Sequence, residues 1–234
     1  MPDVTAAHGP QPSIPPAETG VEANRMIAFS DGVVAIAITL LILPLATITL
    51  PPDDSEAANN PLQFVWHENE ALIAGFVISW AVIFIFWLAH HRIFANVKSI
   101  NGAIIRLNTL WLFAVIVLPF PTNLISQVGH NNTNASRQIT VFYVGTMLIM
   151  SLTLSLMGLV IRRHPELLKD PNAASTSLEA QRGWAVSIIM ALVLVAAFII
   201  PQKATYGLLA LIIIEPVFQW RSRRAAASPN AISS

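Results

Sequence analysis

Residues 25–45 read RMIAFSDGVVAIAITLLILPL, a short polar segment that leads directly into a long apolar one. The polar segment holds Arg25, Ser30 and Asp31, and after Asp31 the next Asp, Glu, Lys or Arg is Asp53. About 20 residues at 1.5 Å each cross the roughly 30 Å hydrocarbon core of a bilayer. An ionisable Asp beside such a span is costly and usually marks a site. The stretch therefore predicts a transmembrane helix with a functional polar base.

The composition of the whole chain agrees with a membrane protein. Of its 234 residues 54% are hydrophobic and 11% are charged, the mean hydropathy is +0.61, and residues 71–89 form a second uncharged stretch. This is far more apolar than a typical soluble domain. The absence of cysteine excludes disulfides and thiolate metal sites. We expect an integral membrane protein that is not an enzyme, because no nucleophile–base motif such as His-Glu-x-x-His occurs.

Apolar segments separated by polar connections predict an all-α bundle of six transmembrane helices, one repeat unit per chain. Their expected bounds are about 26–48, 70–94, 102–126, 139–161, 183–200 and 204–220. The last two are short, so a tight hairpin is expected there, with a re-entrant pair as the alternative. The channel domain would cover 25–221. The flanking segments 1–24 and 222–234, rich in Pro, Ala and polar residues, are expected to be disordered cytoplasmic tails.

The connections differ strongly in charge. Two basic residues, Arg137 and Lys203, fall on one side of the membrane, and eleven fall on the other: Arg25, Arg92, Lys98, Arg106, Arg162, Arg163, Lys169, Arg182, Arg221, Arg223 and Arg224. The positive-inside rule then makes both termini cytoplasmic. The first outer connection is acidic, which either concentrates cations by its field or is simply a solvated loop: Asp53, Asp54, Glu56, Glu68 and Glu70.

One face of the first helix is a candidate pore wall. At 100° per residue, Ile36, Leu40 and Leu43 fall on a narrow stripe, and Thr39 borders it. Such a stripe also suits a lipid-facing or buried helix, so periodicity alone leaves the choice open. The Thr39 hydroxyl has two possible roles, to offer oxygen ligands to an ion or to donate back to the Ala35 carbonyl.

Asp31 lies about one turn inside its span and needs partners, since an isolated charge there costs about 2.5 kcal/mol or more. The second span ends in Trp-Leu-Ala-His-His-Arg at 87–92, at the same depth. We predict a structural polar network at this end: Arg25, Phe29, Ser30, Asp31, Trp87, His90, His91, Arg106 and Asn108. Arg25 and Asp31 are six residues apart and lie on different faces of the helix, so Arg25 is expected to anchor the helix at the headgroups or to pair with a neighbouring helix.

The histidines suggest two further roles, metal binding and pH sensing. A metal site would join Asp31, His90 and His91, but adjacent residues of a helix point about 100° apart, which disfavours a shared ion. We therefore expect no metal, and pH sensing by an imidazole stays open. Farther along, Pro119 and Pro121 in the run 118–122 (LPFPT) are expected to kink or end the third helix.

The pattern Arg-x-x-x-Phe-Ser-Asp at 25–31 resembles the first-helix signature of the transmembrane protein 175 family of potassium channels. The Trp and His at the end of the second helix and the LPFPT run are also similar to that family. Prokaryotic members have one six-helix unit and form tetramers, and the resemblance implies the same here. It also implies that Ile36, Leu40 and Leu43 form the pore constriction and that Thr39 contributes to selectivity. The Thr-Val-Gly-Tyr-Gly filter of conventional potassium channels does not occur.

The resemblance implies passive conduction of potassium and other monovalent cations through a homotetrameric pore lined by the first helix, with an apolar gate. Potassium would be the permeant and no cofactor is expected. A secondary transporter, or a proton-permeable protein that uses intramembrane Asp, His or Glu residues, is the alternative. The partner is the lipid bilayer, no nucleic acid is expected, and the location is the plasma membrane of a prokaryote.

Overall fold

The computed structural model describes residues 21–51, 56–127, 133–170 and 177–199. It is almost entirely helical within these ranges, as predicted. The helices are α1 (Ala23–Leu40), α2 (Leu43–Ala46), α3 (Pro61–Glu68), α4 (Glu70–Phe94), α5 (Gly102–Val117), α6 (Pro119–Gln127), α7 (Thr133–Arg163) and α8 (Ser177–Ile199). The described residues also form two 3₁₀ turns, η1 (Glu56–Asn59) and η2 (Pro165–Leu167), and two short strands, β1 (Val21–Glu22) and β2 (Ser99–Ile100).

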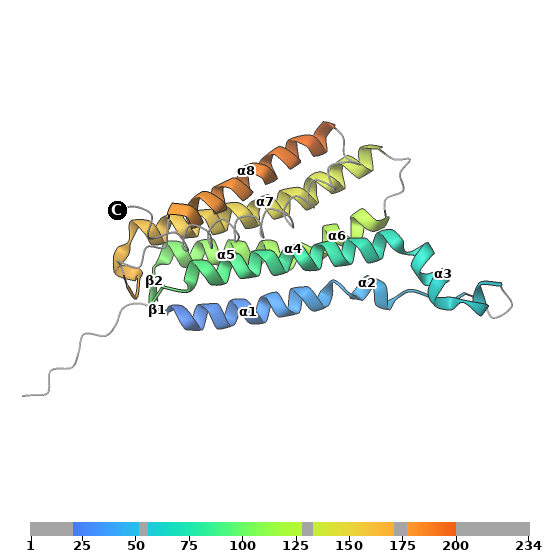
Figure 1. Cartoon of the computed structure of the whole chain (residues 1–234), viewed down its shortest axis with the longest axis horizontal. Coiled ribbons are helices and arrows are strands. Elements are labelled where there is room, and N and C mark those ends of the chain that lie inside the picture. The colour runs from blue at the N-terminus through green and yellow to red at the C-terminus, as the bar shows by residue number, and fades with distance from the viewer. Residues whose placement is uncertain (1–20, 52–55, 128–132, 171–176, 200–234) are drawn as a thin grey trace, which may run out of the picture.

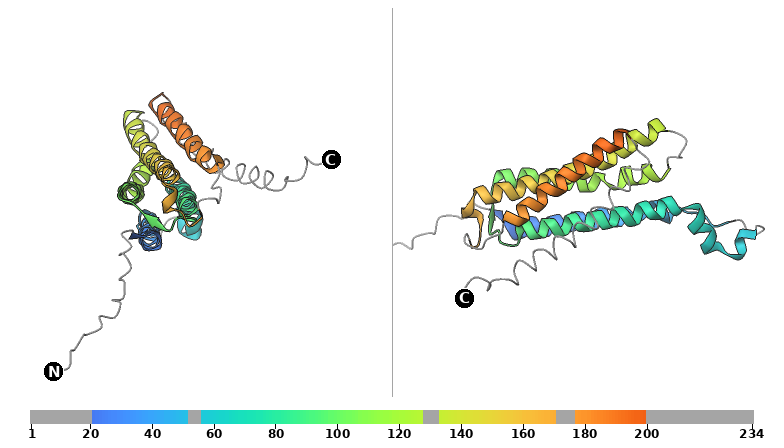
Figure 2. Two further views of the ribbon diagram at one scale, coloured as in Figure 1. Left: turned by 90° about the vertical axis from the view of Figure 1, so that its left-hand side faces the viewer. Right: turned by 45° about the horizontal axis from the view of Figure 1, so that its top comes forward.

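The long helices lie side by side along one direction (Figure 1). Helix α1 packs on α4 and α5, while α7 packs on α5 and α8, and the end-on view in Figure 2 shows these helices grouped as a bundle. The short helix α3 projects from the end of the bundle opposite β1 and β2 (Figure 1). Four segments of the described residues are long and apolar enough to cross a membrane: 23–46, 70–94, 102–125 and 134–163.

Helix α8 is shorter in its apolar part, which runs from Trp184 to Ile199. The predicted span 204–220 lies outside the described residues. The core is built from large side chains of several helices, among them Val82, Trp111, Val144 and Met147, all fully buried. The prediction of an all-α membrane bundle is thus confirmed.

The first span is interrupted, although its sequence predicts one helix over 26–48. Helix α1 ends at Leu40, and the single turn α2 starts at Leu43 with Pro44 in its first turn. Proline has no N–H, and its ring clashes with the carbonyl four residues earlier, here that of Leu40. The chain instead makes a tight turn in which the Ile42 amide donates to the Thr39 carbonyl at 3.3 Å.

The third span is also divided, and here the prediction is confirmed. Helix α5 starts at an Asn101 cap, whose side chain accepts the Ile104 amide at 3.0 Å, and it ends at Val117. Helix α6 starts at Pro119, so Leu118 alone separates the two helices. Prolines at 119 and 121 remove two backbone donors, so the α-helical ladder cannot continue unbroken through this point.

Three chain segments meet through their backbones beside the start of α1. Strand β1 pairs antiparallel with β2, and Val97 forms a further bridge to Leu168 in the connection after α7. The Lys98 amide donates to the Leu167 carbonyl at 2.9 Å. Strand β1 and the first residues of α1 thus lie within the segment 1–24 that composition assigns to a tail, because backbone pairing fixes them. Residues 1–20 and 222–234 lie outside the described residues.

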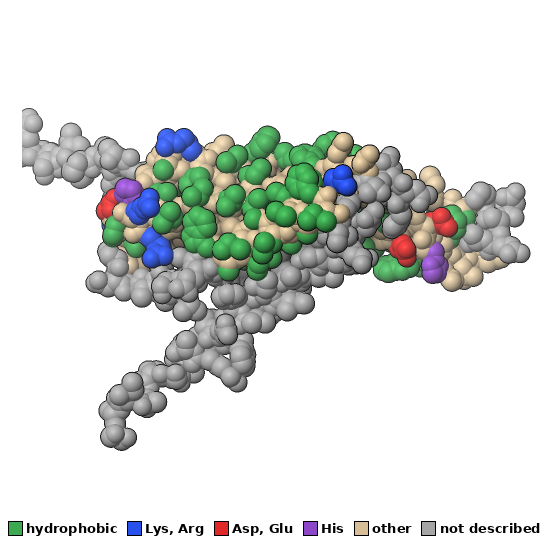
Figure 3. Space-filling view, turned by 90° about the horizontal axis from the view of Figure 1, so that it is seen from above, with side chains coloured by type: hydrophobic (Ala, Val, Ile, Leu, Met, Phe, Trp, Pro, Cys, Tyr) green, Lys and Arg blue, Asp and Glu red, His purple; other side chains and the backbone are tan. Residues whose placement is uncertain are grey.

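Charged side chains gather at the two ends of the bundle, and the surface between them is mainly apolar (Figure 3). Arg137 lies near the start of the 31-residue helix α7, and Arg162 and Arg163 lie at its other end. On this face the charged side chains thus flank an apolar belt, as a bilayer requires.

Candidate pore helix and its polar base

Helix α1 has one buried and one exposed face. Val34, Ala37 and Leu41 are buried against the bundle, continuing a stripe that starts at Ser30. The opposite face is apolar and exposed: the exposed fractions are 61% for Ile36, 40% for Leu40 and 55% for Leu43, and Phe29 is exposed on the same helix. The predicted stripe thus lies on the face that the chain itself leaves uncovered.

Thr39 lies on this exposed face beside Leu40. Its hydroxyl donates to the Ile36 carbonyl at 2.8 Å, three residues earlier, and not to the expected Ala35 carbonyl. An Oγ1 at the end of a helix can reach carbonyls three or four residues back, and the turn at Leu41 and Ile42 tightens the helix there. Because the hydroxyl hydrogen points to that carbonyl, the lone pairs of Thr39 Oγ1 point away from it.

At the base of α1, Asp31 is held by two residues of α4. Trp87 Nε1 donates to Asp31 Oδ1 at 2.9 Å, and His91 Nε2 lies 3.5 Å from the same oxygen. Trp87 and His91 are one turn apart on α4, and their rings lie 4.5 Å apart. Neighbours four residues apart share a helix face, which is why one carboxylate reaches both.

A second, fully buried chain of hydrogen bonds joins α1, α4 and α5. His90 Nε2 pairs with Asn108 Oδ1 at 2.9 Å, and Asn108 Nδ2 donates to Ser30 Oγ at 3.0 Å. Ser30 Oγ donates in turn to the Met26 carbonyl at 2.9 Å. The His90 ring also stacks on Trp111 of α5, with centroids 4.5 Å apart. The polar base therefore ties the start of the pore-helix candidate to two neighbouring helices.

The structure leaves three predicted members outside this network. Arg25, Phe29 and Arg106 are exposed, and no hydrogen bond or ion pair among the described residues joins them to it. Arg106 precedes Asn108 by two residues, about 200° around α5, so it points outward when Asn108 points inward. Arg25 is exposed near the start of α1, which agrees with the expectation of an anchor at the membrane surface.

The two histidines have different partners, as the angle between adjacent helical residues requires. His90 faces Asn108 inside the bundle, whereas His91 faces Asp31 near its surface. Among the described residues, no group of three His, Asp or Glu side chains is arranged to hold a metal ion.

Sequence reasoning missed a buried hydroxyl cluster at the division between α5 and α6. Ser79 Oγ lies 2.9 Å from Thr122 Oγ1 and 2.8 Å from the Tyr143 hydroxyl, and all three side chains are buried. The cluster ties α4 to α6 and α7. Ser79 is the one hydroxyl in the uncharged stretch 71–89, which is the signal that points to such a partner.

Several known proteins are similar to this chain in sequence. Residues 25–119 match the family described as "Endosomal/lysosomal potassium channel TMEM175". A potassium channel of Streptomyces collinus is 34% identical over 164 residues, which cover 69% of this chain and 74% of that protein. A human protein named "Endosomal/lysosomal proton channel TMEM175" is 36% identical over 98 residues, 41% of this chain and 19% of that protein.

Among solved structures, the fold is similar to that of a homologue from Chamaesiphon minutus, described as a homologue of a lysosomal potassium-selective channel. The TM-score is 0.64 at 26% sequence identity, and the match covers 85% of this chain and 97% of the other.

Proposed function

The chain belongs to the transmembrane protein 175 family of potassium channels, and we propose that it conducts potassium and other monovalent cations passively through a pore lined by α1. The proposed assembly is a homotetramer in which Ile36, Leu40 and Leu43 of each copy form rings around a shared axis. Family members are channels, and the chain is not an enzyme.

The observation that carries this proposal is the uncovered apolar face of α1. Its other face is fully used by packing on α4 and α5, so the Ile36 stripe is available to an axis between copies. Rings of large aliphatic side chains gate by dewetting, because an ion cannot shed its water without replacement ligands. Thr39, beside Leu40, offers hydroxyl oxygens when the rings separate.

The proposed orientation places the end that carries β1, β2 and most basic residues in the cytoplasm of a prokaryote. The support is the charge distribution along the chain, since Lys and Arg favour the cytoplasmic side of short connections. Potassium is the permeant in this proposal, and no cofactor takes part.

The test is a flux measurement on purified protein in liposomes loaded with potassium chloride. We expect a flux driven by the potassium gradient alone, larger for potassium than for sodium. Currents through single particles in a planar bilayer should far exceed about 1,000 ions per second, which an alternating-access cycle does not reach. Absence of any potassium-dependent flux would overturn the channel proposal, and slow saturable flux would favour a transporter.

Proton permeation is a second candidate, and the comparison with the human protein favours it, because that relative is named a proton channel. The titratable groups Asp31, His90 and His91 lie together at the base of the candidate pore helix. A pH gradient across the same liposomes, followed with an internal pH dye, separates the two ions. Acidification in the absence of potassium would assign proton conduction to the chain.

A further inference from the structure

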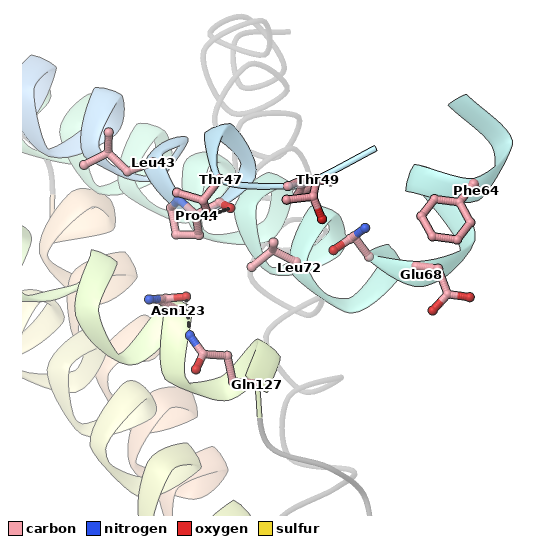
Figure 4. A pocket seen from close by; sticks show the side chains of 11 residues that line it. Leu43, Pro44, Thr47, Thr49, Phe64, Glu68, Leu72, Asn123 and Gln127 are labelled. Atoms are coloured by element: carbon pink, nitrogen blue, oxygen red, sulfur yellow. Dashed lines mark hydrogen bonds between the residues drawn. The ribbon is translucent and has the colours of Figure 1, made fainter. Parts of the chain in front are cut away.

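A cavity of about 700 Å³ opens beside Leu43 (Figure 4). Three parts of the chain form it: α2 and the residues that follow it, the junction of α3 and α4, and α6. Leu43 is the last member of the stripe on the candidate pore helix. The cavity therefore reaches the last member of this stripe.

The polar part of the cavity wall consists of hydroxyl, side-chain amide and carboxylate groups. Polar lining residues include Thr47, Glu68, Asn69, Asn123 and Gln127. Several donors of these side chains are already bonded within the protein: the Thr47 hydroxyl to the Pro44 carbonyl at 2.8 Å, and Asn69 Nδ2 to the Val65 carbonyl at 3.0 Å.

In the same way, Gln127 Nε2 donates to Asn123 Oδ1 at 2.8 Å (Figure 4). A side-chain amide whose N–H is bonded to protein keeps its carbonyl oxygen as an acceptor. The described residues that line the cavity include one carboxylate, that of Glu68, and no Lys, Arg or His. The wall thus carries one negative charge and no positive charge, which favours a cation over an anion.

The size of the cavity decides the state of that cation. At about 30 Å³ per water, 700 Å³ holds on the order of 20 water molecules, so an ion inside keeps its hydration shell. A single carboxylate and such a volume do not make a tight site for a divalent metal, which takes six to eight oxygen ligands at short distance. Weak accumulation of a hydrated monovalent ion fits both properties.

We propose that this cavity is the outer vestibule of the permeation pathway, in which hydrated monovalent cations accumulate before they pass Leu43, and that Glu68 supplies the attracting charge. The inference rests on the proposed channel function and deepens it. The proposal assigns this role to Glu68 and not to Glu70, because Glu70, two residues along the chain, does not line the cavity.

The magnitude follows from the cavity dimensions. A sphere of the cavity volume has a radius of about 5.5 Å, and one charge at that distance raises the local cation concentration about twofold at 0.1 M salt. At 1 M salt the Debye length is about 3 Å and the enrichment falls to about 1.2-fold. Loss of the charge should therefore matter at low salt and vanish at high salt.

The experiment compares Glu68→Gln with Glu70→Gln, a matched control that removes the same charge from another exposed glutamate. Single-channel potassium current is measured for ions that enter from the side of α3, at 0.1 M and 1 M potassium chloride. We expect Glu68→Gln to lower the current about twofold at 0.1 M and to leave it nearly unchanged at 1 M. Glu70→Gln should change it little at either concentration.

A gain-of-charge variant, Gln127→Glu, tests the same cavity from α6 and should raise the current at 0.1 M. Equal effects of Glu68→Gln and Glu70→Gln would mean that surface charge acts in general, and this would overturn the vestibule proposal. An unchanged current in Glu68→Gln would also overturn it. Wild-type protein without any potassium current would instead overturn the channel proposal itself. The two failures are therefore distinguishable.

Discussion

The hydrogen bond between Asn108 Nδ2 and Ser30 Oγ, 3.0 Å long, gives a sharp test of how the base of α1 is held. Both side chains are buried, and they come from α5 and α1, 78 residues apart. Ser30→Ala, Asn108→Leu and the double variant form a double-mutant cycle that isolates this pair from its surroundings.

The expected energies follow from the partners of each group. Ser30→Ala removes the bond from Asn108 and the donation to Met26, and should lower the free energy of unfolding by about 1 kcal/mol. Asn108→Leu also removes the partner of His90 Nε2, and His90 Nδ1 is buried with no hydrogen-bond partner among the described residues. Because a buried unsatisfied group adds about 1–3 kcal/mol, this variant should lose about 3 kcal/mol in total.

The coupling energy between the two substitutions is the decisive quantity. Hydrogen bonds between membrane helices average about 0.6 kcal/mol and reach about 1.7 kcal/mol, so we expect the double variant to lose about 1 kcal/mol less than the sum of the single variants. Reversible unfolding in mixed micelles, with a denaturing detergent as the variable, measures all three free energies.

Thr109→Val is the control for this cycle, because the Thr109 hydroxyl is exposed and bonds only its own helix, at the Ile105 carbonyl. Its loss should stay within about 0.5 kcal/mol. Strictly additive losses for Ser30→Ala and Asn108→Leu would refute the reasoning, since they would mean that the two groups do not interact in the folded protein.

Three further substitutions test the candidate pore and the buried cluster. Ile36→Asn should wet the constriction and raise potassium leak about tenfold for each 1.4 kcal/mol taken from the barrier; Ile188→Asn, equally exposed on α8, should leave the flux unchanged. Thr39→Val should reduce discrimination between potassium and sodium. Unchanged reversal potentials would mean that the Thr39 hydroxyl only forms its hydrogen bond within α1. Tyr143→Phe should lower the free energy of unfolding by about 1 kcal/mol, because Ser79 keeps another partner, and a loss above about 3 kcal/mol would contradict this account.

The positions of the spans were predictable from the sequence because the bilayer imposes a length and forbids charge. The predicted range 70–94 coincides with α4. Helix α7 starts at Thr133, six residues before the predicted 139, since a helix continues into water wherever its backbone bonds are satisfied. The hydrocarbon thickness fixes which residues cross the membrane, and it does not fix where a helix ends.

The two faces of α1 were also predictable in part. Periodicity placed Ile36, Leu40 and Leu43 on one stripe, and the structure leaves that stripe exposed. Periodicity did not reveal the turn at Leu41 and Ile42, although Pro44 carried the signal for it. Whether the stripe lines a pore stays a prediction.

The sequence by itself determined that this chain is an apolar helical membrane protein, where most of its described spans lie, and that Asp31 needs partners near the ends of the neighbouring helices. Only the tertiary structure decided which partners: Trp87 and His91 for Asp31, and Asn108 for Ser30, while Arg106 faces outward. The physical reason is that each helix carries its own 3.6-residue period, whereas the rotation and register between helices follow from the packing of all of them together.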